Sequence, residues 1–421
     1  MTQVLRGNIV HAPEMGRLDI LEHGCLVLED GIITGLYRQL PEELANAEVR
    51  DFGDRLIMQS FADMHLHAPQ YPMLGMGMDL PLLDWLNTYT FPTEARFADV
   101  DYARRVYRRL ATDLITNGTT RVCMFSSMHT DATLVLMDEL ERAGVTGYVG
   151  KVNMDRNGLP GKLQETTEES VRETLRWLDG CHFAHVKPII TPRFTPSCTN
   201  ELMTQLGKLA NERGLYVQSH LSENTNEIAW VRELHPDCTQ YWETYNKYGM
   251  WKDHTLMAHC VHSDERERRA IKDAGVVVVH CADSNVNICS GICPVRQMVR
   301  EGLWVTLGSD IAGGAQLPMY KVITMSIRTS KARRVTDEWH PDFLTVPEGY
   351  YLGTTAGHKY FGAGDGFAVG DRLHAVVIDD GDFPEAAHPL TVQERFERAI
   401  YMTHRHNIVS AWSDGREVVR R

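Results

Sequence analysis

The chain has 421 residues, of which 43% are hydrophobic and 24% are charged, and these values are ordinary for a globular protein. Its formal net charge is -13, and no basic run offsets this acidity, which argues against binding to nucleic acid. No apolar stretch approaches the roughly 18 residues of a membrane span, and the amino terminus lacks the pattern of a secretion signal. The nine cysteines are irregularly spaced, which predicts reduced thiols and a cytoplasmic protein.

Short β-like runs occupy both ends of the chain. Near the amino terminus, residues 25–29 and 31–37 form two such runs joined at Asp30-Gly31, a strong hairpin turn pair. Near the other end, residues 375–379, 406–412 and 417–419 have the same character. Neither end holds enough apolar residues to fold alone, so we expect one composite β-sandwich domain from residues 1–55 and 369–421.

Between these ends, short apolar runs alternate with longer helical patterns. The predicted strands are residues 56–63, 119–125, 146–152, 186–192, 215–220, 255–259, 276–280 and 303–307. Predicted helices include residues 101–117, 131–143, 199–213 and 263–274, and each is followed by a glycine suited to end it: Gly118, Gly144, Gly214 and Gly275. Eight strands separated by helices predict an α/β fold, a (β/α)8 TIM barrel over residues 56–368.

Four potential metal ligands stand where predicted strands end. His65 and His67 alternate in an H-x-H pattern, His220 ends the fifth strand and Asp310 follows the eighth. Alternate residues of a strand point the same way, so the first pair can face one ion. Taken alone, H-x-H is more typical of two hydrogen-bonded histidines. The four residues together favour zinc or a similar divalent ion with a position left for water.

Two further residues extend this site towards catalysis. Glu223 lies three residues after His220, where its carboxylate can take a proton from a metal-activated water and return it to a leaving group. The alternative is a loop glutamate that caps the following helix. His259 ends the sixth strand, either as a ligand or as a partner of that water. His280 ends the seventh strand. It can either support the metal ligands by hydrogen bonding or pack in the core, and the sequence favours neither role.

The end of the fourth strand bears on metal count and on substrate. Some barrel hydrolases bridge two metals there with a carboxylated lysine, but here Lys187 comes too early and Arg193 cannot be modified in that way. One metal is therefore expected. Arg193 suits a planar group rich in oxygen and nitrogen, and Phe194 can stack on a ring. An outward surface arginine is the alternative.

Several motifs resemble one known family. Phe61-Ala-Asp-Met-His-Leu-His-Ala-Pro-Gln-Tyr71 is followed by Asp79-Leu-Pro-Leu-Leu-Asp-Trp-Leu86 and Tyr89-Thr-Phe-Pro-Thr-Glu94. Later come Thr191-Pro-Arg-Phe194, Gln218-Ser-His-Leu-Ser-Glu-Asn224, Met257-Ala-His259 and Gly308-Ser-Asp-Ile-Ala-Gly-Gly314. Together they resemble the guanine deaminase family of the amidohydrolase superfamily, and the resemblance covers essentially the whole chain.

The resemblance implies a barrel with a composite β domain, one zinc per chain (Fe²⁺ or another divalent ion being the alternative) and a homodimer. It implies that His65, His67, His220 and Asp310 bind the metal. It also implies a small-molecule substrate, guanine, which is deaminated to xanthine and ammonia. The catalytic residues would be Glu223, Asp310 and His259, and the substrate contacts would be His67, Gln70, Trp85, Arg193, Phe194, His220, Glu223 and Asp310.

Two motifs depart from the family pattern. Ala282-Asp283 stands where Pro-Asn or Pro-Thr is usual, and the motif after the eighth strand begins with Ser309 in place of threonine. The first departure leaves the ring preference open, so a sister aminohydrolase acting on another purine, a triazine or a pterin-like ring stays an alternative. An inactive barrel that serves as a binding or scaffold protein is a second, of another class.

Overall fold

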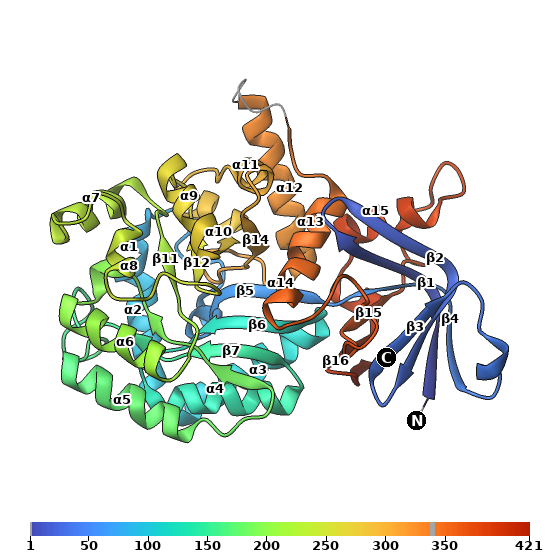
Figure 1. Ribbon diagram of the computed structural model, residues 1–421, viewed down its shortest axis with the longest axis horizontal. Coiled ribbons are helices and arrows are strands. Elements are labelled where there is room, and N and C mark those ends of the chain that lie inside the picture. Colours follow the sequence, from blue (N-terminus) through green and yellow to red (C-terminus); the bar gives the residue numbers. More distant parts are fainter. Residues whose placement is uncertain (1, 337–341) are drawn as a thin grey trace.

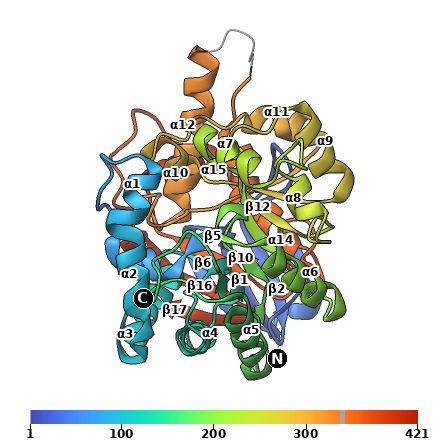
Figure 2. The same cartoon turned by 90° about the vertical axis from the view of Figure 1, so that its left-hand side faces the viewer.

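The computed structural model describes residues 2–336 and 342–421, which form a strand-and-helix barrel with a large β-sheet packed at one end (Figure 1). The helices surround the strands, as the end-on view shows (Figure 2). Within the described ranges, no helix has the length and apolar character needed to cross a membrane. All nine cysteines are free thiols, and most are buried.

Both ends of the chain contribute to the large sheet, which confirms the composite β domain. In the described part of the chain the sheet has seven strands in the order β17-β16-β15-β4-β1-β2-β3. Their bounds are β1 (Thr2–Glu14), β2 (Arg17–Glu29), β3 (Ile32–Tyr37), β4 (Glu48–Gln59), β15 (Ala375–Ile378), β16 (Ile408–Ser413) and β17 (Arg416–Arg420). β4 joins the two ends, because it pairs in parallel with β1 and antiparallel with β15.

The predicted hairpin is present between β2 and β3. Asp30 and Gly31 both have positive φ, 49° and 82°, as a two-residue type I′ turn requires. The domain has its own small core, in which Leu5, Ile57 and Trp412 are buried together.

The barrel strands form two four-stranded parallel sheets among the described residues, β5-β6-β7-β9 and β11-β12-β13-β14, with a short β8-β10 pair between them. Their bounds are β5 (Phe61–His67), β6 (Thr119–Phe125), β7 (Thr146–Gly150), β8 (Val152–Asn153), β9 (Val186–Pro188), β10 (Thr191–Pro192), β11 (Gln218–Leu221), β12 (Leu256–His259), β13 (Val277–His280) and β14 (Trp304–Leu307).

The barrel closes between its first and last strands. The backbone N–H of Asp310 donates to His65 O at 2.8 Å, and the N–H of His67 donates to Ile311 O at 3.1 Å. On the other side, a parallel bridge between Ile190 and Val217 joins the two sheets. The predicted (β/α)8 barrel is therefore confirmed.

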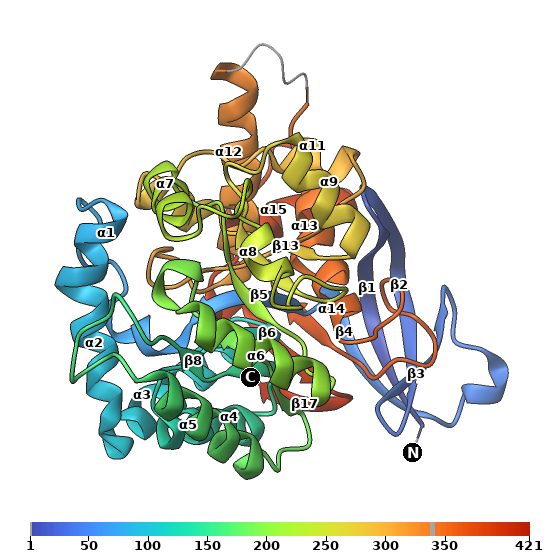
Figure 3. The same cartoon turned by 60° about the vertical axis from the view of Figure 1, so that its left-hand side comes forward.

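The helices pack around the strands, with α1 and α2 along one side of the barrel (Figure 3). Their bounds are α1 (Leu82–Trp85), α2 (Phe91–Ala95), α3 (Val100–Thr116), α4 (Thr130–Ala143), α5 (Thr167–Gly180), α6 (Asn200–Glu212), α7 (Thr225–Leu234), α8 (Glu243–Asn246), α9 (Glu265–Ala274), α10 (Ala282–Asn287), α11 (Val295–Arg300), α12 (Met319–Thr336), α13 (Val346–Gly353), α14 (Thr355–Tyr360) and α15 (Val392–Met402). Short helical turns are η1 (Glu42–Leu44), η2 (Ala68–Met73), η3 (Leu86–Thr90), η4 (Arg96–Ala98), η5 (Thr195–Ser197) and η6 (Arg405–Asn407).

Three predicted strands are interrupted and need correction. Residues 146–152 divide into β7 and β8, and residues 186–192 divide into β9 and β10. Residues 56–63 were expected to form the first barrel strand, but β4 ends at Gln59 and β5 begins at Phe61. The interruption is the single residue Ser60, which is buried. Residues 56–59 pair with β15 in the large sheet, so this sheet extends past residue 55, and the division of the domains there stays a prediction.

Candidate active site

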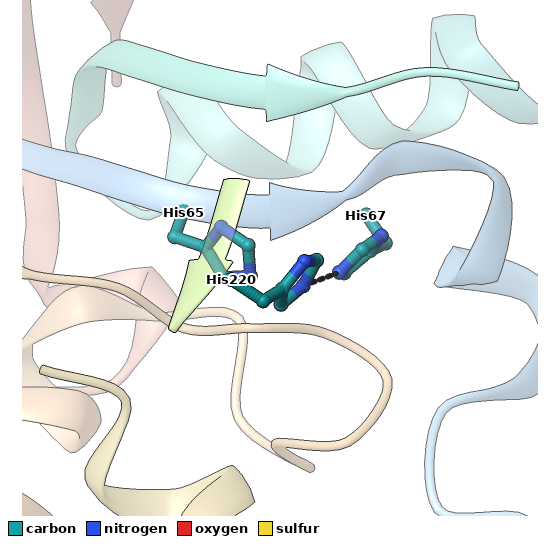
Figure 4. Close-up of side chains that lie close together, drawn as sticks. All are labelled: His65, His67 and His220. Carbon is teal, nitrogen blue, oxygen red and sulfur yellow. Dashed lines mark hydrogen bonds between the residues drawn. The ribbon is translucent and has the colours of Figure 1, made fainter. Parts of the chain in front are cut away.

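Three histidine side chains converge at the carboxyl ends of β5 and β11. His65 and His67 project from β5, and His220 from β11 (Figure 4). The Nε2 atoms of His67 and His220 lie 3.1 Å apart, and all three side chains are buried. The predicted grouping of histidines from distant parts of the chain is thus present in the structure.

Asp310 completes the group from the end of β14. Its Oδ1 lies 3.2 Å from His65 Nε2 and 3.5 Å from His67 Nε2, and its Oδ2 accepts a hydrogen bond from Ser284 Oγ. Burial alone would raise the pKa of Asp310, but the interactions with His65 and the neighbouring imidazoles outweigh it and hold the pKa well below the usual value. The carboxylate is therefore ionised.

The close approach of β14 to β5 depends on a glycine. A Cβ atom at Gly308 would lie 2.8 Å from His65 Cβ and 2.9 Å from His65 O, closer than non-bonded atoms tolerate. Asp310 itself has a φ of 45°, an uncommon conformation for a residue other than glycine. The backbone thus adopts an unfavourable conformation where the carboxylate meets the histidines.

The histidine side chains have the protonation state that metal binding requires. Burial lowers the pKa of His65, His67 and His220, so these imidazoles are neutral. His220 Nδ1 lies 2.5 Å from the carbonyl oxygen of Arg193, which can only accept, so Nδ1 carries the proton and Nε2 presents a lone pair. This Nε2 lone pair, the two other neutral imidazoles and the Asp310 carboxylate fit a divalent cation between them.

Glu223 is buried beside this group, in the loop between β11 and α7. Its Oε1 accepts a hydrogen bond from Ser290 Oγ at 2.9 Å, and its Oε2 lies 3.5 Å from His259 Nε2. Burial raises the pKa of the Glu223 carboxyl. The cap of α7 is formed instead by Asn224 and Glu227, so Glu223 is not the helix cap.

His259 links Glu223 to Asp310. Its Nδ1 lies 2.9 Å from Asn285 Oδ1, and its Nε2 lies 3.8 Å from Asp310 Oδ2. Burial opposes protonation of His259, but the carboxylates of Glu223 and Asp310 outweigh it and raise the pKa of the ring. His259 therefore stands where a donor can stabilise negative charge on an oxygen between these groups.

A cavity with about 490 Å³ of empty space, open to solvent, lies against this cluster. Its lining includes every residue predicted to contact substrate: His67, Gln70, Trp85, Arg193, Phe194, His220, Glu223 and Asp310. His259 and Glu227 line it as well, with Leu82, Leu86, Ile288 and Gly313 as its apolar and backbone surfaces. The arrangement offers polar groups and flat apolar surfaces to a ring.

Arg193 is buried in this cavity and is not an outward surface residue. Its Nη1 and Nη2 donate to Glu94 at 2.6 Å and 3.1 Å. Gln70 Nε2 donates to the same carboxylate at 2.9 Å. Glu94 ends the Tyr89–Glu94 motif, and no role was predicted for it from the sequence. Its only signal was an acidic residue in a largely apolar helical segment.

Other predicted positions lie outside the cavity. Lys187 is exposed on β9 and donates to Phe183 O, which agrees with its exclusion from the site. His280 is buried, and burial lowers its pKa to about 4. Of the two motif departures, Asp283 accepts a hydrogen bond from Ala315 N and Ser309 N donates to Asp63. None of these four side chains is among the described residues that line the cavity.

The sequence matches the Amidohydrolase family over residues 56–418. The chain belongs to this family of hydrolases.

Similar proteins within it carry a more specific name. The guanine deaminase of Mus musculus is 35% identical, with 99% of this chain and 96% of that protein covered. The guanine deaminase of Dictyostelium discoideum is 33% identical, with 99% and 98% covered. A solved guanine deaminase from C. acetobutylicum with guanine bound in its active site is 42% identical, with a TM-score of 0.95, and covers 99% of this chain and 100% of its own.

Proposed function

We propose that the chain catalyses the hydrolytic deamination of guanine to xanthine and ammonia. The observation that carries this proposal is the convergence of the histidine–aspartate cluster, Glu223 and Arg193 at one cavity that is open to solvent. Full-length similarity to guanine deaminases, one of them solved with guanine bound, supports the same substrate.

The metal in this proposal is zinc, held by His65, His67, His220 and Asp310. Three neutral imidazoles and one carboxylate are a ligand set typical of zinc, with Fe²⁺ as the alternative. When bound, the ion supplies Lewis acidity that makes water a stronger acid and a better nucleophile.

Glu223 carries the proton in the proposed reaction. Its carboxylate takes a proton from the attacking water and delivers it to the ring nitrogen beside C2, the carbon that bears the amino group. A second transfer protonates the departing amine, so that ammonia leaves and the carbonyl of xanthine forms. Its raised pKa suits a group that both takes and returns a proton. His259 polarises the attacking oxygen, and Asp310 acts as a second base.

The remaining lining residues bind and orient the ring. Arg193 and Gln70 offer hydrogen-bonding groups to the polar edge of the purine, while Phe194 and Trp85 pack against its face. The Trp85 side chain is itself fixed, because its Nε1 donates to Met76 O at 2.9 Å. A rigid aromatic wall of this kind favours a planar ligand.

We also propose that the protein is a cytoplasmic homodimer, as the family resemblance implies, with the domains divided at residues 55/56 and 368/369. Reduced thiols at all nine cysteines agree with a reducing compartment. Light scattering after gel filtration tests the dimer, and a mass near that of one chain would exclude it.

A substrate screen tests the function directly. Metal-loaded protein is incubated with guanine, adenine, cytosine, a triazine and a pterin, and ammonia release is measured for each. We expect guanine to be the best substrate, with xanthine as its product. Preference for another ring would favour a sister aminohydrolase, and binding without turnover of any ring would favour a scaffold role.

A further inference from the structure

Glu94 is a buried carboxylate behind the cavity that joins two of its lining residues. It lies on α2, with 1% of its surface exposed, and Arg193 is 3% exposed. Two of the five guanidinium N–H groups of Arg193 donate to Glu94. The other N–H groups can therefore donate to a ligand in the cavity.

The same carboxylate fixes the orientation of Gln70. The Gln70 amide nitrogen donates to Glu94 Oε1 at 2.9 Å, and the amide oxygen accepts from Ala312 N at 3.0 Å. The guanidinium also lies over the Phe91 ring, with Cζ 5.2 Å from its centroid. Arg193 and Gln70 are thereby held in one arrangement before any ligand arrives, which reduces the entropy lost on binding.

Glu94 also cancels the charge of Arg193. Because both side chains are buried at short distance, the pair is formally neutral, and this end of the cavity offers N–H donors without a net positive charge. An anionic ring would lose its hydration on entry and gain no compensating charge from the pair. A neutral ring with a carbonyl edge pays a smaller desolvation cost and can still accept from Arg193.

We propose that Glu94 is a positioning residue that determines specificity: by orienting and neutralising Arg193, it makes the cavity select neutral heterocycles over anionic ones. This inference rests on the proposed function, which sets the class of ring that the cavity binds. It adds that the bound ring is neutral. It also implies that a product able to lose a ring proton is bound more weakly than its neutral relatives.

Binding of two purines that differ in charge tests the proposal. At mildly alkaline pH xanthine is largely an anion, whereas hypoxanthine is largely neutral. Calorimetry on metal-loaded protein gives the dissociation constant of each. We expect wild type to bind xanthine at least about tenfold more weakly than hypoxanthine. Equal or tighter binding of xanthine by wild type would overturn the proposal without any variant.

Two variants then assign the effect to Glu94. Glu94→Gln keeps the shape and leaves the charge of Arg193 uncompensated, so the preference should shift towards xanthine by about tenfold or more. The double variant Glu94→Gln/Arg193→Gln removes both charges and should return the ratio towards wild type. A purely structural Glu94 would weaken both ligands together, and an unchanged ratio in folded Glu94→Gln would overturn the proposal.

Guanine turnover by wild type separates this inference from the proposed function. If guanine is not deaminated, but wild type and Glu94→Gln show the expected ratios of xanthine to hypoxanthine binding, the proposed function is wrong and the role of Glu94 stands. If guanine is deaminated but the ratio of the xanthine and hypoxanthine dissociation constants does not change in the variants, the proposed role of Glu94 is wrong and the proposed function stands.

Discussion

Replacement of Glu223 by glutamine separates proton transfer from binding. The residue is 5% exposed, and its Oε1 accepts from Ser290 Oγ at 2.9 Å. Glutamine has nearly the same shape and can accept that hydrogen bond through its amide oxygen. What it cannot do is take a proton from water. Glu223→Gln should therefore leave the fold, metal content and ring affinity close to wild type.

The expected loss of turnover follows from the contribution of a positioned acid–base group. Such a group accelerates a reaction by roughly 10²–10⁴, which corresponds to about 3–5 kcal/mol of activation free energy. Because His259 Nε2 lies 3.5 Å from Glu223 Oε2, the imidazole can stabilise the attacking oxygen in the variant. We therefore expect residual activity rather than none.

The assay follows xanthine formation at saturating guanine, with metal content and guanine affinity measured on the same samples. Glu233→Gln is the matched control, because this glutamate lies on α7, which follows the catalytic loop, but is exposed. The control should behave as wild type. Turnover by Glu223→Gln close to wild type, with metal and affinity intact, would refute the assignment of Glu223 as the proton carrier.

Three further predictions concern metal, substrate and pH. Asp310→Ala should lose bound metal and activity together, as measured by elemental analysis and ammonia release, and full activity without metal would contradict the proposed site. Arg193→Ala should lose mainly guanine activity, while adenine stays a poor substrate for both proteins; undiminished guanine turnover would exclude the proposed pose. Burial raises the pKa of Glu227 from 4.5 to about 7, so the folded state binds this proton more tightly and stability falls as pH rises through that interval. Glu227→Gln should therefore gain stability relative to wild type from about pH 4.5 to 7 and hold that gain above it; a pH-independent difference in melting temperature would argue against the shift.

A fully buried strand such as β6 and a regular helix such as α4 were predictable from the sequence. The predicted strand at residues 119–125 matches β6 fully, and α4 ends one residue before Gly144, whose left-handed conformation stops the helix. The division between β4 and β5 was not predictable. Residues 56–62 are all buried and, apart from Gln59 and Ser60, apolar, so periodicity contains no signal for a break between two different sheets.

The candidate site shows the same contrast. His65, His67, His220 and Asp310 could be grouped because strand ends of a parallel barrel meet at one edge. The hydrogen-bond partners of the site residues could not be predicted, because bonds such as that from Ser290 to Glu223 join loops whose course the sequence does not reveal. Glu94 illustrates the limit, because it acts on Arg193 from a separate helix, 99 residues earlier in the chain.

The closure of the barrel determines when folding and metal binding can be completed during translation. The hydrogen bonds between Asp310 and His65, and between Ile311 and His67, join the first barrel strand to the last. During synthesis, one edge of β5 stays unpaired until β14 has left the ribosome. Unpaired strand edges promote aggregation. The proposed ligand set is also incomplete until residue 310 has been added. We therefore expect metal uptake to follow translation of the whole barrel, and nascent chains that stall before β14 to depend on chaperones.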